Sequence, residues 1–594
     1  MKTFKTFCAS FALIFLGLFP ISAMGQSLPH TFTANTPSTA SEVNANFKYL
    51  LDRIGGIRET TVNCGTNGSG INAAIQSGYN SIIINGICKE NIKLDGTEGN
   101  TPRLLKLRGA NNNASLDKII DNSSYTDYVI KAWYSGMLLS IDNLTISGGE
   151  RGISTWSNIN LKIYNSKVDD YKEKGVHLGG GSVMDAENLT IDGSNSSASS
   201  SETGLELWGS SMAYTRNLTI TNNQRHGIAT YISHIELDGN VSLTGNTKTI
   251  NVGHNASLSS RATVTITGTN STSDEAIEVN QGVFHAHDGS INVTSAPMAF
   301  HAWMSNVFIR NFTGVGNGSL DRDVMVFSYS TGAIENVILS NGGNSGLGVH
   351  NSNLEIDNLT SSNNQRDGIS ASRSKMEVRD SVFSGNDDGI DIDEGSSLYI
   401  RSSNISSNSD DGIEIEGNSV AKIRDSTTIA SNSDNGIKVA QGSLVEIEDS
   451  TVSGVSGKNA IVGYNNAILI LDESSNGTTL ISTTNADAIS LRNSDGEIRD
   501  GVVVSGTGSS NYPSGIALYQ GSYIKIEGGA TVTGTQDSGS IVGNLHSTIE
   551  IEHGSTISHD VWCGMDNTTM VTLLSNNGNY SPATMGNNCR TSRL

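Results

Sequence analysis

A short apolar phrase recurs along most of the chain and constrains the fold more than any other feature. Each copy places an apolar–variable–apolar triplet after a glycine or another small or polar residue. Seventeen copies begin 21 to 29 residues apart, among them RGIST at 151, KGVHL at 174, TGLEL at 203, DGIDI at 388, DGIEI at 411 and SGIAL at 514. Between them lies a second alternating phrase, as in LSIDNLTISGG and LEIDNLTSSNN, bounded by Asn, Ser, Asp or Gly.

Alternation with a period of two predicts short strands, and the flanking turn residues predict tight turns between them. With 65 glycines and almost no helical periodicity after residue 60, the pattern excludes a helix bundle. Short strands repeating every ~23 residues predict a parallel β-solenoid, in which stacked coils pair each strand with its neighbours at about 4.8 Å. The Ile, Val and Leu of the repeats then form one continuous core.

The segment VNCGTNGSGINAAIQSGYNSIIINGICKENIKL, which begins at residue 62, resembles the N-terminal cap of a known superfamily. It is similar to secreted bacterial right-handed parallel β-helix proteins of the pectate-lyase-like superfamily, over residues 60–594. The resemblance implies an all-β, single-stranded right-handed parallel β-helix of about 17 or more coils, with a short amphipathic helix over the first coil. Because this fold carries lyases, hydrolases, epimerases, tailspikes and adhesins, it does not set the function.

Residues 1–25 have the pattern of a signal peptide. Lys2 and Lys5 precede an apolar run from Ala9 to Ile21, and small residues precede Gln26. No later run approaches the ~20 apolar residues of a membrane helix. We therefore expect a secreted bacterial protein, extracellular or on the outer cell surface, without a membrane span.

Residues 26–56 predict a short helical leader ahead of the β-helix, which would occupy residues 57–594. Thr39 and Glu42 fit a capping box. One helical face carries the apolar residues Val43, Phe47, Leu50, Leu51 and Ile54. Two interpretations stay open: the apolar stripe docks on the end of the β-helix, or the leader drives self-association into a homo-oligomer such as a trimer.

Four cysteines follow the signal peptide, as two pairs near opposite ends of the predicted β-helix. In an oxidising compartment they predict the disulfides Cys64–Cys88 and Cys563–Cys589. Cross-links at these places would protect the ends of the solenoid, where open strand edges otherwise invite aggregation.

Acidic residues are concentrated between Asp380 and Ser450, where 15 acidic side chains stand against four basic ones. The formal net charge of the whole chain is −22, which argues against nucleic acid as a partner because such binding needs a basic surface. In NDDGIDIDEGSS and NSDDGIEIEGNS the isoleucines point inward and the alternating carboxylates outward. A solvated acidic surface is one interpretation; the other is a calcium site with the ligands Asp388, Asp391, Asp411 and Glu414.

The same stretch partly resembles the polygalacturonase-like relatives. Asn386-Asp387-Asp388 and Asp410-Asp411 match their first two motifs at a spacing of one coil. The third motif is missing, because Asn435-Gly436 stands where that family has a histidine, and no Arg-x-Lys follows on the matching strands. Aspartates also serve such turns structurally, so a glycoside hydrolase is less expected than a lyase.

The two outward positions of the repeated phrase form two rows along the predicted coils. The second row carries the aromatic residues Trp156, Trp208, Tyr231 and Trp303, whose flat faces match the apolar face of a pyranose ring. The first row carries the candidate general acids or bases His177, Glu206, Glu278 and His301. Packing of the aromatic rings beneath loops, and surface hydrogen bonding of the histidines, are the structural alternatives.

Two functions follow from these rows. The first is a secreted β-helix protein that binds a polysaccharide along an outer strand face and, if it is an enzyme, cleaves it as a polysaccharide lyase with calcium as an assisting cofactor. The second is a non-catalytic cell-surface, adhesive or structural β-helix protein. Both leave the glycan and its linkage open.

Overall fold

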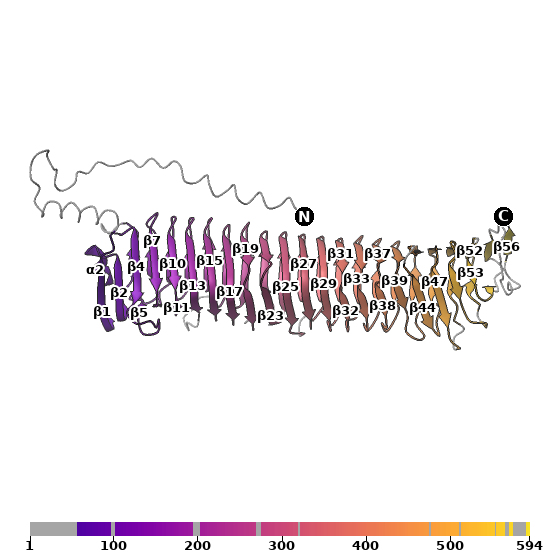
Figure 1. Ribbon diagram of the computed structural model, residues 1–594, viewed down its shortest axis with the longest axis horizontal. Coiled ribbons are helices and arrows are strands. Elements are labelled where there is room, and N and C mark those ends of the chain that lie inside the picture. Colours follow the sequence, from indigo (N-terminus) through magenta and orange to yellow (C-terminus); the bar gives the residue numbers. More distant parts are fainter. Residues whose placement is uncertain are drawn as a thin grey trace, which may run out of the picture. The chain divides into compact units, whose positions relative to one another are not determined.

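The computed structural model describes the ranges 56–96, 101–193, 202–268, 275–318, 321–474, 477–509, 513–537, 539–552, 554–564, 569–573 and 590–593. Over these residues the protein is an all-β parallel solenoid of about 21 turns with almost no helix. Its strands lie side by side in the order of the sequence (Figure 1). The signal peptide and the helical leader, apart from Gly56, lie outside the described residues and stay predictions.

One face of the solenoid, sheet B, is a parallel sheet built by the repeated apolar phrase. Each strand pairs with the strand one coil before it and the strand one coil after it, as β12 does with β9 and β14. The described part of sheet B has 20 strands. They are β3 (Ile92–Leu94), β6 (Tyr128–Ala132), β9 (Arg151–Thr155), β12 (Lys174–Leu178), β14 (Thr203–Trp208), β16 (His226–Tyr231), β18 (Lys248–Gly253), β21 (Glu275–Asn280), β24 (Met298–Trp303), β26 (Met325–Ser328), β28 (Leu347–His350), β30 (Ile369–Ser372), β33 (Ile390–Asp393), β36 (Ile413–Ile415), β39 (Ile437–Val439), β42 (Ile461–Tyr464), β45 (Ile489–Arg492), β48 (Ile516–Tyr519), β51 (Ile541–Gly543) and β54 (Val561–Cys563).

The second phrase of each repeat builds sheet A, which bends over the rest of the coil. Long strands such as β13 (Val183–Asp192) and β15 (Met212–Thr221) run through the bend, where Asn188 and Asn217 have φ of 54° and 56°. Asparagine tolerates this left-handed conformation better than most residues. Asn217 Nδ2 also donates to Asn188 Oδ1 at 3.0 Å. The recurring NLT triplets therefore serve the bend and its side-chain ladder between coils.

The interior is a stack of apolar rows, one residue per coil. In sheet B the first inward position is occupied by residues that are at most 1% exposed, among them Ile153, Val176, Leu205, Ile228, Ile250, Ile277, Phe300, Met325, Leu347, Ile369, Ile390, Ile413 and Ile437. A coil cannot bury this row alone, so neighbouring coils supply the cover. The alternation in the sequence thus determines which side chains point outward and are able to contact a ligand.

A second ladder lies inside the turn that leads into sheet B. Asn386 is 2% exposed, and its Oδ1 accepts from the backbone N–H of Asn364 at 3.1 Å and from Asn364 Nδ2 at 2.9 Å. Asn408 continues the ladder by accepting from Asn386. Asn386 is thus part of the coil's internal hydrogen bonding, which favours a structural role over the catalytic asparagine of the polygalacturonase motif.

The N-terminal end of the solenoid is closed by helix α2 (Ile71–Gln76), which packs Ile71, Ala74 and Ile75 into the core. This agrees with the short capping helix that the resemblance implied. The Glu90 carboxylate accepts from the backbone N–H of Ile71 at 2.8 Å and so satisfies an open helix end. Within the described residues no helix has the length and apolarity needed to cross a membrane.

The predicted disulfide between Cys64 and Cys88 is confirmed, with an S–S distance of 1.98 Å. It links β1 (Glu59–Gly68) to β2 (Ser81–Lys89) beside the capping helix. At the other end Cys563 is also disulfide-bonded. Cys589 lies outside the described residues, so the pair Cys563–Cys589 stays a prediction.

Candidate functional site

The predicted aromatic side chains lie in one row along the edge of sheet B. The register runs from Trp208 through Tyr231, Gly253 and Asn280 to Trp303, one residue per coil. Trp156 follows β9 directly, and its N–H donates to the carbonyl of Ala132 in the coil before. Residues that are far apart in sequence therefore share one edge.

The row begins one coil earlier than the sequence analysis proposed. Trp133 follows Ala132 as Trp156 follows Thr155, and those two preceding residues are register partners. The phrase YVIKAW matches the pattern of RGISTW except for the missing glycine, so the signal was present in the sequence. We call Trp133, Trp156, Trp208, Tyr231 and Trp303 the aromatic row.

The tryptophans of this row keep between 36% and 44% of their surface exposed. Glycines one coil further on make room for two of the rings. A Cβ atom at Gly179 would lie 2.0 Å from a ring carbon of Trp156, and one at Gly253 would lie 3.3 Å from the ring of Tyr231. The rings rest on neighbouring backbone and still offer apolar surface to solvent, so they are only partly packed away.

Two of the predicted catalytic side chains, His177 and Glu206, are buried rather than exposed. They are 6% and 8% exposed, respectively. Lys174 Nζ donates to Glu206 Oε1 at 3.0 Å, and the His177 ring stacks near Trp156 with a centroid distance of 6.1 Å. Both residues occupy the outward position that the alternation predicted, but neighbouring side chains cover this part of the strand face.

The surroundings of His177 keep it neutral. Burial, followed by the positive charges of Arg151 and Lys174, lowers the pKa of His177 to about 3. Arg151 Nη1 lies 3.1 Å from His177 Nδ1 and is necessarily the donor. The neutral ring therefore accepts at Nδ1 and carries its proton on Nε2, which lies 3.9 Å from Glu206 Oε2.

The other two predicted catalytic residues, Glu278 and His301, reach solvent. They are register partners on β21 and β24, with side-chain exposures of 20% and 25%. Lys248 Nζ donates to Glu278 Oε2 at 2.9 Å, and Asn251 Nδ2 donates to the same oxygen at 3.0 Å. Glu278 also lines a hollow of about 390 Å³ with Lys248 and Asn251. This part of the row is accessible to a ligand.

Further along, the same two rows carry the acidic residues. Asp391, Glu414 and Lys438 are register partners in the first row, as the alternation predicted. Lys438 hydrogen-bonds Glu414 and lies 3.4 Å from Glu416. Glu414, a predicted calcium ligand, is therefore engaged by an ammonium group.

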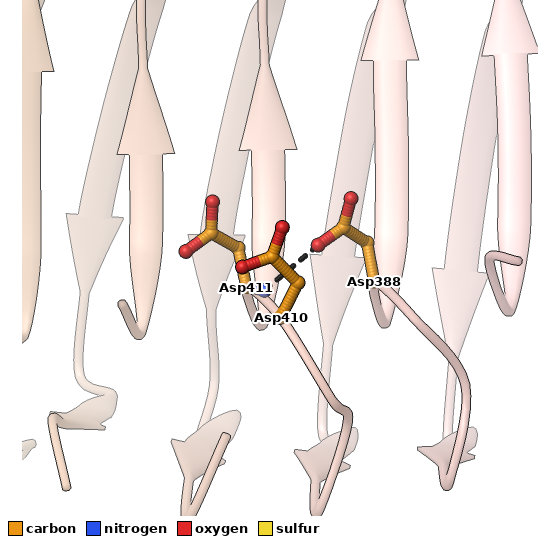
Figure 2. Close-up of side chains that lie close together, drawn as sticks. All are labelled: Asp388, Asp410 and Asp411. Carbon is orange, nitrogen blue, oxygen red and sulfur yellow. Dashed lines mark hydrogen bonds between the residues drawn. The ribbon is translucent and has the colours of Figure 1, made fainter. Parts of the chain in front are cut away.

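The carboxylates that come together are Asp388, Asp410 and Asp411 (Figure 2). One oxygen from each lies within 4.8 Å of the others. Asp388 and Asp411 were predicted ligands, whereas Asp391 and Glu414 are not in this group and Asp410 takes the third place. The turn before β36 brings Asp410 close to Asp388 of the preceding coil. Strand alternation does not predict this approach, because Asp410 does not belong to a strand.

Two of these aspartates also serve the backbone. Asp388 Oδ1 accepts from the N–H of Asp411 at 2.8 Å, and Asp411 Oδ1 accepts from the N–H of Asn435 at 2.8 Å. Each keeps a second carboxylate oxygen, and hard cations such as calcium prefer such ligands. The cluster could therefore hold a metal ion in addition to its structural role.

Burial and mutual repulsion raise the pKa values of the carboxyl groups in and beside this cluster. Burial, together with the charges of Asp367, Asp411 and Glu414, raises the pKa of Asp388 to about 8, against the opposing effect of the Asp411 N–H. Burial and neighbouring carboxylates likewise raise the pKa of Asp391 to about 7 and that of Asp411 to about 6. A cation would relieve the same repulsion that protons relieve.

Comparison with known proteins supports the fold. Residues 324–484 match the family described as the right handed beta helix region. The A-module of the Azotobacter vinelandii mannuronan C-5 epimerase AlgE6 is 14% identical over 58% of this chain and 90% of its own, with a TM-score of 0.30. The AlgE4 A-module of the same organism is 14% identical over 68% of this chain and 91% of its own, with a TM-score of 0.24. These TM-scores are too low to support an argument about activity, and no curated protein matches.

Proposed function

We propose that the protein binds a polysaccharide along the aromatic row. The observation that carries this proposal is the alignment of four tryptophans, each 36% to 44% exposed, on one edge of sheet B. Exposed indole rings reduce solubility unless they contact a partner, and their flat apolar faces suit pyranose rings. Polar groups of the neighbouring strands would then meet the sugar hydroxyls.

The spacing of the rings favours a polymer over a small ligand. Trp208 and Tyr231 belong to consecutive coils, with ring centroids 5.7 Å apart. Trp133 and Trp156 also lie one coil apart. A linear glycan running along the solenoid would meet these rings in succession, whereas a single sugar would use one or two of them.

Glycan arrays and affinity electrophoresis test the binding proposal. The double variant Trp156→Ala/Trp208→Ala should lose affinity by about tenfold or more per ring, in the range of interface hot spots. Trp562→Ala is the matched control, because Trp562 is as exposed as Trp208, at 44%, but lies on β54 outside the aromatic row. Equal loss in the control, or no loss in the double variant, would contradict the proposal.

Lyase chemistry is a second candidate, supported by the accessible Glu278. The Glu278 carboxylate can act as a base, and the Lys248 ammonium group and the Asn251 amide beside it are donors that can stabilise developing negative charge. Incubation with uronate polysaccharides should then raise the absorbance of unsaturated chain ends, and Glu278→Gln should abolish the rise. A protein that binds glycan without this absorbance would be the non-catalytic surface or adhesive protein.

Calcium at Asp388, Asp410 and Asp411 belongs to the same proposal, as a structural ion or as an aid to glycan contact. Calorimetry at pH 8 with calcium should show binding heat that Asp410→Asn reduces. Magnesium is the control ion, since it keeps its waters and prefers fewer carboxylates.

Secretion and self-association through residues 26–56 complete the proposal. Light scattering of the mature protein with and without these residues tests the self-association. The truncated protein should have a smaller oligomeric state, and an unchanged oligomeric state would contradict a role of the leader.

A further inference from the structure

A second hollow lies around the corner from Trp303, where sheet B turns into sheet A. It has a volume of about 610 Å³. Its rim includes Met304, which directly follows Trp303, and Tyr329, one coil further on. We call it the corner groove. It is therefore continuous with the end of the aromatic row.

The described side chains that line the corner groove are all uncharged. Asn255, Gln281 and Asn306 supply amides, and Val283, Met304 and Tyr329 supply apolar surface at 46%, 51% and 61% exposure. Hollows elsewhere on the described surface include charged side chains, such as Glu355 and Lys375 in one and Asp380 in another. The hollow on sheet A beside Tyr164 is also lined by carboxylates and arginines.

The corner position that carries three of these side chains has a left-handed backbone in other coils as well, for example at Ile232, Arg373 and Leu545. Gln281, Met304 and Tyr329 stand at the coil corner with φ of 54°, 49° and 51°. One coil further on, the corner residue is Asn351 with φ of 49°, and asparagine suits that conformation much better than methionine or tyrosine. Asparagine can therefore replace Tyr329 without backbone strain, which makes this position suitable for a test of its side chain.

We propose that the corner groove is a subsite for an uncharged pyranose residue, which makes a neutral polysaccharide the ligand of the aromatic row. The proposal rests on the binding function proposed above. Amides can satisfy sugar hydroxyls in both donor and acceptor roles, and Tyr329 and Met304 offer apolar surface to the ring. A uronate carboxylate would lose water here without gaining a cationic partner.

The choice of ligand also bears on the chemistry. β-Elimination removes a proton that is acidified by the uronate carboxyl group, so a neutral chain is no substrate for a lyase. The structure then favours retention of a neutral glycan over its cleavage by elimination.

Titration calorimetry with neutral and anionic polysaccharides tests the proposal, using xylan, mannan and glucan against polygalacturonate and alginate. The test variant is Tyr329→Asn, which installs the residue that the next coil carries at the same corner and so relaxes the backbone. Leu545→Asn is the matched control, because Leu545 has φ of 52° and 47% exposure at a corner far from the groove. We expect wild-type protein to prefer a neutral chain, with affinity about tenfold weaker in Tyr329→Asn and unchanged in Leu545→Asn.

The outcomes separate this proposal from the one on which it rests. Preference for a polyuronate that is lost in Trp156→Ala/Trp208→Ala would overturn the neutral ligand and leave the aromatic row standing. Neutral binding that Tyr329→Asn does not weaken would overturn the corner subsite alone. Absence of binding to every polysaccharide would overturn both.

Discussion

The coils from Tyr128 to Trp303 and those from Asp367 to Lys438 share one backbone plan but carry opposite chemistry at their outward positions. The first segment carries exposed aromatic rings, a buried ion pair of Lys174 with Glu206, and two buried histidines, His177 and His226, whose lowered pKa keeps them neutral. In the second, carboxylates follow one another from coil to coil. We call them the aromatic segment and the acidic segment.

The difference shows that outward side chains of very different chemistry are compatible with the same fold. The stability of the fold comes mainly from features that both segments share. Both segments keep the same apolar inward rows and the same buried asparagine ladder, represented by Asn223 with Asn246 and by Asn386 with Asn408. The outward side chains can therefore differ without loss of the fold, and repulsion between their charges affects only the neighbouring coils.

The largest predicted contrast is in the response to pH. Burial and nearby positive charge hold the pKa of His177 at about 3 against an ordinary 6.5. The unfolded aromatic segment therefore binds protons first as pH falls below about 6.5, and its stability falls with pH. Asp388, with a pKa of about 8 against 3.8, has the opposite sign: the folded state holds the extra proton, so stability falls as pH rises from about 4 to 8.

Hydrogen exchange with mass spectrometry measures this contrast segment by segment, after correction for the intrinsic pH dependence of exchange. Burial raises the pKa of Glu202 to about 8, which opposes the effect of the histidines, so the comparison uses a Glu202→Gln background. In it, peptides of β12 to β16 should be better protected at pH 8 than at pH 5, and peptides of β33 to β36 better protected at pH 5. Changes of tenfold or more are expected, since one pKa unit corresponds to about 1.4 kcal/mol. Changes of the same sign in both segments would remove the contrast.

The second prediction concerns the buried pair of Lys174 and Glu206. Lys174→Met leaves a buried carboxylate without its ammonium partner, which costs about 3–5 kcal/mol. Glu206→Gln in the same chain should restore part of this. Lys422→Met is the control, since its pair with Glu446 is half-exposed and should contribute below about 1 kcal/mol. Chemical denaturation followed by limited proteolysis within the aromatic segment measures the loss.

A third, smaller effect is a gain of stability in the acidic segment. Asp388→Asn keeps an acceptor for the Asp411 N–H and removes the repelling charge, and Asn435 already occupies the equivalent turn position two coils later. We expect about 1–2 kcal/mol of stabilisation at pH 8 and almost none near pH 4, below which both the folded and the unfolded state hold the Asp388 proton. Thermal melting at both pH values checks this, and an equal gain at both would point to a cause other than charge.

The smallest difference between the segments is predicted for the asparagine ladder. Asn386→Ala and Asn246→Ala each leave a buried backbone N–H, that of Asn364 or of Asn223, without its acceptor, which costs about 1–3 kcal/mol. The two losses should agree, because the ladder is common to both segments. Unequal losses in denaturant titrations would show that the outer rows also influence the interior.

Much of the fold could be predicted from local pattern. The period of two in DGIDI and RGIST assigns inward and outward positions, and the repeat length sets the register between coils. Trp133 was overlooked because Val129 stands where most copies have glycine or another small residue, although the copy at 323 has a valine there as well. Asp410 was not chosen as a ligand because its approach to Asp388 depends on the path of a turn, which strand alternation does not describe.

The sequence by itself determined the winding of the chain and the rows into which Trp156, His177, Asp391 and their counterparts fall, since alternation and repeat length are properties of neighbouring residues. Only the tertiary structure decided that His177 and Glu206 lie buried while Glu278 stays accessible, and that Asp388 holds its proton. Solvation and charge at each position are set by side chains one coil away, 21 to 29 residues distant in the chain. Their packing is a three-dimensional property that a linear pattern does not contain.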